Sequence, residues 1–521
     1  MARPTDRRPA QSAGTAPRPL PARAFPIALA GVLLAIGLAY ANHFDNTFHF
    51  DDSHAVIQNP YVRSLAHVPR FFRDATTFSI LPSNQSYRPV LQTTLALDYW
   101  LGGGYNARVF QTATFLWYLL LLAVLFVLVR GLVRAVDTPE VHARWLALGA
   151  TALYGLHPVS AETVNYVIQR GDLLSTLGVA AALAVWALWP AGRRGYLWVL
   201  PLAFGMLAKP PAAVFPALVF GWVLATEASW RRALASSIGP GVAALALAIW
   251  VRAHEVPTFA LATGTRGQYW LTQPWVALRY FWTFLVPAGL SADLDWPLLT
   301  SVADPRAATG LVFLVVLAAA TAAAWRKPAW RPVAYGLFWF AIAQLPTAVV
   351  PIADVANDHR MFFPFIGLVL AAAWLAYRVW LASSDLQQHP RLVVAAAAVP
   401  LLALGWGTHG RNAVWHTDEA LWHNVTQTSP ANGRGWMNYG LTRMEKGDYP
   451  TAIASFERAL PLTPDYNLLR INLGIAYGAT GRVRDAQREF NEAIRLAPND
   501  WRSHLYAGRW LLQSGNLGEA Y

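Results

Sequence analysis

Residues 109–133 read VFQTATFLWYLLLLAVLFVLVRGLV, and this stretch decides the fold. Its only charged residue is Arg130, and a helix needs about 20 mainly apolar residues to cross a bilayer. Charged residues make up 13% of the whole chain and hydrophobic residues 55%, whereas soluble domains carry about 25% charged residues. We therefore expect an all-α protein that crosses a membrane many times.

Similar apolar stretches recur along most of the chain. They lie at residues 25–41, 144–156, 173–189, 196–208, 211–226, 234–251, 272–287, 308–325, 332–351, 361–380 and 392–408. Several are shorter than about 20 residues, so their ends are approximate. The first ends in Ala39-Tyr40-Ala41, which resembles a signal-peptidase site. We expect a retained signal-anchor instead, because many later spans follow.

The net charge of +12 raises the question of a nucleic-acid partner. No Lys/Arg-rich patch with interleaved aromatic residues supports one, and the positive charges form short clusters between apolar stretches. The positive-inside rule explains that pattern, so we expect membrane lipids and no nucleic acid. The chain contains no Cys, which excludes disulfides and Cys metal sites.

The basic clusters also predict the orientation. Residues 1–24 are rich in Arg and Pro, so we expect a disordered cytoplasmic tail. The basic cluster at residues 326–331 then falls on the cytoplasmic side only if residues 272–287 do not cross the membrane. That aromatic-rich segment reads as an interfacial or re-entrant helix. The prediction is about eleven spans within residues 25–408 of an inner (plasma) membrane protein, with residues 42–108 and the C-terminus outside.

A soluble domain is expected after a linker at residues 409–432. Residues 433–521 are polar and repeat with a period of about 34 residues, which is typical of tetratricopeptide repeats. Small and aromatic residues recur at matching positions, namely Trp436, Gly440, Ala452, Phe456, Ala459 and Pro464, then Leu473, Gly474, Tyr477, Ala486, Phe490, Ala493 and Pro498. Two repeats are complete and a third, with Gly508 and Ala520, is incomplete at Tyr521. We expect this α-solenoid to hold a partner polypeptide, with a passive spacer as the alternative.

Polar residues that could take part in catalysis or binding gather in the loops predicted to lie outside the cytoplasm. They are Asp51, Asp52, Tyr87, Arg88, His157, Glu162, Arg170, Asp172, Lys209, His359 and Arg360. A carboxylate beside a hydroxyl can act as general base, and Arg and Lys can hold a phosphate and stabilise it as a leaving group. This combination suits transfer of a sugar from a lipid-phosphate carrier to a hydroxyl.

The loop motifs also carry a family resemblance. They are residues 50–59 (FDDSHAVIQN), Tyr87-Arg88-Pro89, Leu156-His157-Pro158 with Glu162, residues 170–174 (RGDLL), Lys209, and His359-Arg360 before residues 361–364 (MFFP). In this order, across residues 42–366, they resemble the transmembrane and tetratricopeptide-repeat O-mannosyltransferases and their bacterial relatives. The resemblance implies a GT-C glycosyltransferase fold, a polyprenyl-phosphate sugar donor, and inverting transfer to Ser or Thr hydroxyls.

Roles follow for each group of residues. Asp51 or Asp52 is the expected base, with Asp51 favoured slightly. Phosphate binding is expected of Arg88, Arg170, Lys209 and Arg360, and acceptor or sugar binding of Tyr87, His157, Glu162, Asp172 and His359. Each has a structural alternative, such as a helix cap for the acids, pairing of Arg170 with Asp172, or snorkelling of Lys209.

Three wider alternatives stay open. A transferase of the same fold could act on glycolipid or envelope glycan, or the chain could be a membrane-anchored scaffold without enzymatic activity. Asp293 and Asp295 are two carboxylates without a third ligand, so we assign no metal site, and a divalent ion stays an open alternative that these residues do not support.

Overall fold

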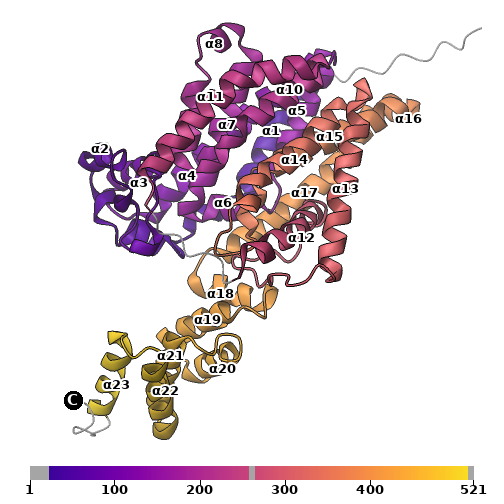
Figure 1. The fold of residues 1–521 in the computed structure, drawn as a ribbon. Coiled ribbons are helices and arrows are strands. Elements are labelled where there is room, and N and C mark those ends of the chain that lie inside the picture. Colours follow the sequence, from indigo (N-terminus) through magenta and orange to yellow (C-terminus); the bar gives the residue numbers. More distant parts are fainter. Residues whose placement is uncertain (1–22, 257–263, 514–521) are drawn as a thin grey trace, which may run out of the picture.

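The computed structural model describes residues 23–256 and 264–513, and every regular element in these residues is a helix. A bundle of long helices is followed by an arm of short paired helices (Figure 1). The predicted all-α class, a membrane bundle followed by a solenoid, is confirmed. The predicted basic tail lies outside the described residues apart from its last two positions.

Within the described residues, nine helices are long and apolar enough to cross a membrane. Their helical cores are α1 (Ala24–Ala39), α4 (Ala107–Ala135), α7 (Arg170–Leu188), α10 (Phe215–Glu227), α11 (Trp230–His254), α13 (Pro305–Trp325), α14 (Arg331–Val349), α15 (Phe365–Ala382) and α17 (Pro390–Val414). Two shorter helices, α5 (Glu140–Gly155) and α9 (Val199–Ala208), pack against α4 and α7. The nine long helices and these two shorter ones together agree in outline with the predicted eleven spans. The helix α12 (Arg266–Leu285) is not among the nine.

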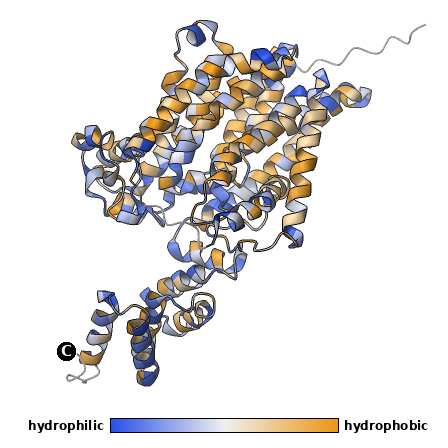
Figure 2. Cartoon of the chain, in the orientation of Figure 1, coloured by the Kyte–Doolittle hydropathy of each residue, from blue (hydrophilic) through white to orange (hydrophobic). Residues whose placement is uncertain are grey.

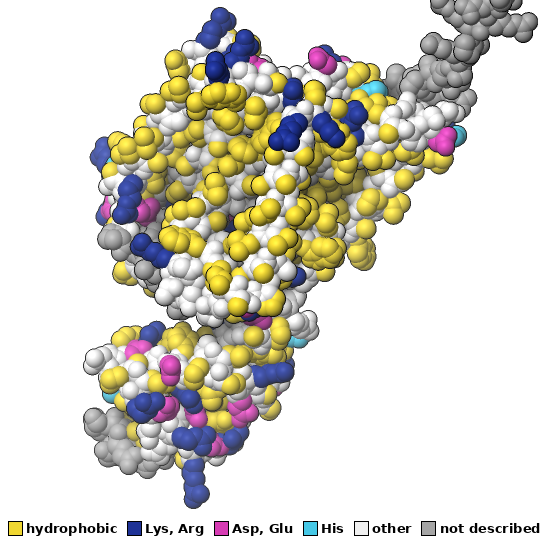
Figure 3. All heavy atoms as spheres, turned by 45° about the vertical axis from the view of Figure 1, so that its right-hand side comes forward, with side chains coloured by type: hydrophobic (Ala, Val, Ile, Leu, Met, Phe, Trp, Pro, Cys, Tyr) yellow, Lys and Arg dark blue, Asp and Glu magenta, His cyan; other side chains and the backbone are white. Residues whose placement is uncertain are grey.

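The outer surface of the bundle is apolar, as a lipid-facing surface must be. In Figure 2 the bundle helices are mostly orange (hydrophobic), whereas the arm carries far more blue (hydrophilic). Leu311, Val315 and Val316 of α13 are exposed, and Trp406 of α17 is 81% exposed. Because lipid offers no hydrogen bonds, helices satisfy their own backbone groups there. Figure 3 shows the same apolar surface, with charged side chains concentrated towards its ends and on the arm.

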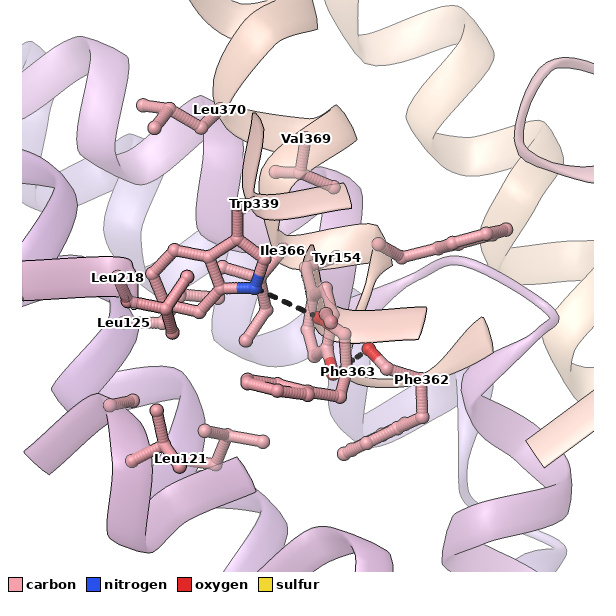
Figure 4. Close-up of a cluster of buried hydrophobic side chains, with 14 of the residues drawn as sticks. Leu121, Leu125, Tyr154, Leu218, Trp339, Phe362, Phe363, Ile366, Val369 and Leu370 are labelled. Carbon is pink, nitrogen blue, oxygen red and sulfur yellow. Dashed lines mark hydrogen bonds between the residues drawn. The ribbon is translucent and has the colours of Figure 1, made fainter. Parts of the chain in front are cut away.

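A core of aromatic and aliphatic side chains fixes the helices against one another. Figure 4 shows part of it, where Trp339 of α14 and Tyr154 of α5 converge on the turn before α15. The Trp339 indole donates to the carbonyl of Phe363 at 3.2 Å, and the Tyr154 hydroxyl donates to the carbonyl of Phe362 at 2.8 Å. These bonds hold the backbone that follows Arg360.

Short helices and loops cover one end of the bundle. The loop between α1 and α4 contains α2 (Val68–Phe71) and α3 (Pro89–Leu101), and α6 (Ser160–Asn165) precedes α7. At the other end lie α8 (Pro190–Arg194) and α16 (Ser384–Gln388) (Figure 1). The loop-covered end is the one that carries the predicted site residues.

The arm is built from antiparallel helix pairs. It follows α18 (Asp418–Thr428) and comprises α19 (Gly433–Glu445), α20 (Tyr449–Ala459), α21 (Asn467–Ala479), α22 (Val483–Leu496) and α23 (Trp501–Gln513). A Cβ on Gly440 would lie 2.5 Å from the ring of Phe456, and one on Gly474 would lie 3.0 Å from the ring of Phe490. The repeat pattern therefore reflects close helix pairing, as predicted. Residues beyond Gln513, including Ala520, are outside the described residues.

Candidate active site

Hydrogen bonds join loops that are far apart in the sequence into one polar face. His49 of the first loop contacts the Trp415 carbonyl and the Asp418 carboxylate, both at 2.6 Å. Ser291 contacts Asp358 through its backbone N–H at 2.8 Å. These bonds place the loop after α1 against the segment between α17 and α18, and the loop after α12 against the residues before α15.

Asp51 lies on this face with a half-exposed side chain, 51% of it accessible. Its Oδ1 and the Nε2 of His54 are hydrogen-bonded at 3.2 Å, and its backbone N–H donates to the Tyr166 hydroxyl at 3.0 Å. Burial alone would raise the carboxyl pKa, but the bond to His54 and the charges of His54, Arg88 and Arg434 outweigh it and lower the pKa below its usual value. The group is therefore ionised and accessible at neutral pH.

Asp52 lies next to Asp51 but points into the protein and is fully buried. One carboxyl oxygen accepts from the backbone N–H of His49 at 3.1 Å, and the other from the N–H of Ile168 at 2.8 Å. Burial raises its pKa to about 7, although both amides favour the ionised form. Such a pKa would suit a general base, but geometry decides first. With no exposed oxygen, Asp52 clamps the loop between α1 and α4 to the segment before α7.

The turn at Phe50 explains why the two acids diverge. Phe50 has φ of 47°, in the left-handed region that side chains other than glycine rarely adopt. Its ring packs on Trp422 at 4.8 Å and on Tyr166 at 5.4 Å between centroids. These aromatic contacts hold the strained turn, which directs Asp52 inward and leaves Asp51 at the surface.

The pKa of His359 is lowered by burial and also by three of the predicted phosphate-binding residues, namely Arg88, Lys209 and Arg360. Burial lowers the pKa of His359 well below its usual value, and the charges of Lys209, Arg360 and Arg88 add to this effect. Arg88 also acts on Asp51. These three residues, termed here the cationic group, therefore lie near His359, and Arg88 also lies near Asp51.

The donors of the cationic group differ in how far they are occupied. The Nε of Arg88 is buried without a partner, and its guanidinium lies 5.1 Å from the Phe78 ring centroid. Lys209 donates to Asp172 at 2.6 Å, and Arg360 donates to the carbonyl of Asp354 at 2.9 Å. Burial lowers the pKa of Lys209, and Asp172 opposes that effect. Asp172 thus supports Lys209 rather than pairing with Arg170.

A buried acid, Glu162, lies next to His359. The Oε1 of Glu162 and the Nδ1 of His359 are hydrogen-bonded at 2.8 Å, and Oε2 of Glu162 is buried without a partner. Burial raises the pKa of Glu162 well above its usual value, and the nearby Asp358 raises it further. Glu162 and His359 therefore form a buried hydrogen-bonded pair in which burial favours the neutral form of each partner.

Three other predicted site residues have structural surroundings. Arg170 is fully buried, and its guanidinium donates to Asp98, Thr114, Thr94 and the Phe110 carbonyl. The Tyr87 hydroxyl donates to the Phe72 carbonyl at 3.0 Å and accepts from the Trp250 indole. The His157 ring is buried and stacked on Phe284, and burial lowers its pKa to about 4. None of the three offers a free group to the polar face.

The acids considered as metal ligands are both engaged by the arm. Asp293 accepts two bonds from the guanidinium of Arg434 in α19, at 2.6 and 2.7 Å, and Asp295 accepts from the N–H of Ala431. Among the described residues, no group of three or more His, Asp or Glu side chains is arranged to hold a metal ion.

Arg434 is the main site residue that sequence reasoning missed. It lies 3.7 Å from Asp354 in addition to its bonds with Asp293, and its charge lowers the pKa of Asp51. Its position in a repeat helix gave no signal, because repeat arginines are usually solvated. His54 and Tyr166 were missed too, although His54 follows the acidic pair by only two residues.

A cavity of about 360 Å³ opens beside this face. It is lined by residues 294, 296–298, 300 and 353–356, together with Gly264 and Gln268. Asp354, which contributes to the lining, holds Arg360 through its carbonyl. The cavity therefore lies close to Arg360.

The fold and the polar face define a class: a multi-span helical membrane protein that carries tetratricopeptide repeats. Family models confirm the repeats. One described as "TPR repeat" matches residues 440–481, and one described as "Tetratricopeptide repeat" matches residues 471–520.

Curated proteins similar to most of the chain narrow this class. The chain is 24% identical to Protein O-mannosyl-transferase Tmtc3 of Drosophila melanogaster over 90% of its length, and 24% identical to Protein O-mannosyl-transferase TMTC4 of Homo sapiens over 80%. A shorter match, 34% identical over 27% of the chain, is to Protein O-mannosyl-transferase TMTC4 of Mus musculus. The chain is a relative of the transmembrane and tetratricopeptide-repeat O-mannosyltransferases.

The shared region is only part of those proteins. It covers 58% of the fly protein and 64% of the human one. The crystal structure of the APC/C hetero-tetramer Cut9-Hcn1 aligns over 89% of this chain and 90% of that one, at 14% identity. Its TM-score of 0.20 is too low to indicate a shared fold.

Proposed function

We propose that this protein is a GT-C-type glycosyltransferase that moves a sugar, expected to be mannose, from a polyprenyl-phosphate carrier to Ser or Thr hydroxyls of proteins. The names of its relatives support protein O-mannosyl transfer at the level of the family. The carrier, the inverting course and the residue roles are parts of this proposal.

The observation that carries the proposal is the position of Asp51. Asp51 is a half-exposed carboxylate on the polar face, its pKa is held low, and Arg88 of the cationic group acts on it electrostatically. A base therefore stands on one side, and cations suited to a phosphate stand on the other. A lipid-linked donor needs this combination, because its leaving group is a phosphate.

Transfer would be a single displacement. Asp51 takes the proton of the acceptor hydroxyl, and the hydroxyl oxygen forms a bond to the anomeric carbon of the sugar. The bond between that carbon and the phosphate oxygen breaks, and the polyprenyl phosphate leaves with its negative charge. Attack opposite the leaving group inverts the anomeric configuration, and no sugar–enzyme bond forms.

The surrounding residues would divide the remaining work. Arg88 and Arg360 bind the phosphate, with Lys209 held beside them by Asp172. Charge-assisted bonds of this kind are strong where water is largely excluded. Glu162 and His359, a buried pair beside these cations, would orient the sugar.

The repeats would present the acceptor polypeptide. The first repeat helix, α19, contacts the polar face through Arg434. A polypeptide bound along the solenoid would therefore end near Asp51. This placement favours a protein acceptor over glycolipid or envelope glycan.

Transfer of lipid-linked mannose to acceptor proteins tests the proposal. The purified wild type should transfer mannose from polyprenyl-phosphate mannose, and Asp51→Asn should lower the rate by roughly 10²–10⁴-fold, as expected for loss of a general base. Wild-type rates in the Asp51→Asn variant would exclude Asp51 as the base. Transfer to lipid alone would favour the glycolipid alternative, and partner binding without any transfer would favour the scaffold.

We also propose that the polar face and the repeats lie outside the cytoplasm of a cell with this protein in its inner (plasma) membrane. Because the chain has no Cys, a single introduced cysteine reports its own side. Ala431→Cys should react with an impermeant reagent in intact cells, whereas Ser384→Cys in α16 should not. The opposite labelling would reverse the orientation.

A further inference from the structure

We propose that a cavity at the end of the bundle opposite the candidate active site binds the phosphate headgroup of an anionic phospholipid. The cavity measures about 330 Å³ and lies where α4, α5, α10, α14 and α15 end or begin. Its lining includes Asp137, Arg331, Trp374, Tyr377, Arg378 and Leu381.

The arginines of this cavity lack the acidic partners that their neighbours have. Nearby, Arg130, Arg134 and Arg144 all pair with the single carboxylate of Glu140. Within the described residues, neither Arg331 nor Arg378 forms an ion pair. The Nε of Arg378 is buried without a hydrogen-bond partner, which costs free energy unless an acceptor fills the site.

One carboxylate does contribute to the lining. Asp137 is exposed and has φ of 62°, in the left-handed region. It offsets part of the positive charge, and it would repel an anion bound between Arg331 and Arg378. The cavity still carries one more positive than negative side chain, so an anion is the favoured occupant.

The aromatic and apolar neighbours place the cavity at the level of lipid headgroups. Tyr377 stacks on Trp380, its hydroxyl is 3.0 Å from Nδ1 of His142, and the Trp374 indole donates to the Ala329 carbonyl. Tyr and Trp concentrate where a bilayer meets water. Leu375 and Val379 of the same helix are exposed, as expected for a surface against acyl chains. A lipid can thus place its tails along α15 and its phosphate in the cavity.

The charge of this end favours an anionic lipid. Figure 3 shows Lys and Arg side chains gathered along the upper end of the bundle, above the apolar surface. Basic pockets between membrane spans bind anionic lipid headgroups. Arg also matches a phosphate with two parallel bonds. The inference does not depend on the proposed transferase activity.

The test compares lipids by native mass spectrometry of the full chain in neutral detergent. Dioleoyl phosphatidylglycerol should bind, and dioleoyl phosphatidylcholine should bind far more weakly. The double variant Arg331→Gln/Arg378→Gln should bind phosphatidylglycerol at least about tenfold more weakly, because two charge-assisted contacts are lost. The double variant Arg194→Gln/Arg391→Gln removes equal charge from exposed positions at the same end and should bind like the wild type.

Asp137→Asn keeps the proposal falsifiable if the double variant does not fold. Asn tolerates the left-handed conformation, and loss of the carboxylate should strengthen phosphatidylglycerol binding, which a damaged fold would not do. Equal binding of both lipids, or wild-type binding by the Arg331→Gln/Arg378→Gln variant, would overturn the proposal. Sodium phosphate that occupies the site while phosphatidylglycerol does not would assign the cavity to a soluble phosphate and also overturn it.

Discussion

Asp51 and Asp52 are neighbours with the same side chain, yet their surroundings give them opposite properties. Asp51 is half exposed and its pKa is lowered, whereas Asp52 is buried and its pKa is raised to about 7. The sequence could indicate that the pair is chemically important but could favour Asp51 only slightly. The difference comes from the left-handed turn at Phe50 and from the amide of Ile168, more than a hundred residues away, which no local pattern reveals.

Replacement of Asp52 should therefore affect stability more than chemistry. Asp52→Ala leaves the N–H groups of His49 and Ile168 buried without acceptors, and each such group costs about 1–3 kcal/mol. We expect a clearly lower melting temperature, measured by intrinsic fluorescence in detergent. Asp51→Asn should melt much closer to the wild type, since the side chain is half exposed and the amide oxygen of Asn can still pair with His54. Equal melting of the Asp52→Ala variant and the wild type would contradict the clamp.

Arg170 and Arg360 also differ in role: we expect Arg170 to stabilise the fold and Arg360 to bind the donor. Arg170→Gln breaks a buried ion pair with Asp98, which is expected to cost about 3–5 kcal/mol and reduce the yield of folded protein. Arg360→Gln should leave the protein folded but reduce kcat/KM for the lipid-linked donor by roughly tenfold or more. Size-exclusion profiles and donor titrations distinguish the two outcomes. A folded Arg170→Gln variant with impaired donor binding would instead restore the predicted phosphate role of Arg170.

At the scale of elements, apolar length and the repeat period predicted the helices, but not which helices touch. Residues 109–133 had to become a helix in lipid, and α4 covers them. The contact between Arg170 of α7 and Asp98 of α3 joins residues 72 positions apart. Such a partner is set by how the helices pack, so the sequence alone suggested Asp172, the nearest acid, instead.

The crossing of α14 and α15 offers a sharp test of that packing. A Cβ on Gly367 would lie 2.2 Å from the carbonyl oxygen of Gly336 and 2.7 Å from the backbone nitrogen of Phe340. Small residues allow such close approach between membrane helices. Gly367→Ala should separate the helices, cost about 1–3 kcal/mol and shift the turn that carries Arg360.

Gly149→Ala is the matched control for Gly367→Ala. A Cβ at this exposed position of α5 meets nothing within 4 Å. Alanine is the better helix former by about 1 kcal/mol, so this variant should melt at or above the wild-type temperature. Gly367→Ala should therefore have a lower melting temperature and slower mannose transfer than Gly149→Ala. A Gly367→Ala variant as stable and active as the control would refute tight α14–α15 packing.

At the scale of the whole molecule, the sequence predicted two parts but not their junction. The repeats were identified from residues such as Gly440 and Phe456, which pair within one repeat. Arg434 and Asp293 are 141 positions apart and belong to different parts, so no periodicity connects them. Their contact places a repeat residue at the membrane domain's polar face, where its charge reaches Asp51.

The pH dependence of transfer should reveal that contact. Arg434 lowers the pKa of Asp51, so Arg434→Gln should raise it. A general base works only when deprotonated, and its activity is lost as the pH falls through its pKa. The acidic limb of kcat/KM should therefore move to higher pH in Arg434→Gln. His54→Ala should move it in the same direction and further, because the bond to His54 is the strongest lowering influence on that carboxyl.

Two variants separate this electrostatic effect from a loosened arm. Arg434→Lys keeps the positive charge but loses the two-bond contact with Asp293, so the acidic limb should stay close to the wild-type position while KM for a polypeptide acceptor rises. Arg484→Gln removes an exposed charge from α22 and should change neither quantity. If Arg434→Gln raised KM without moving the acidic limb, Arg434 would hold the arm in place without acting on the base.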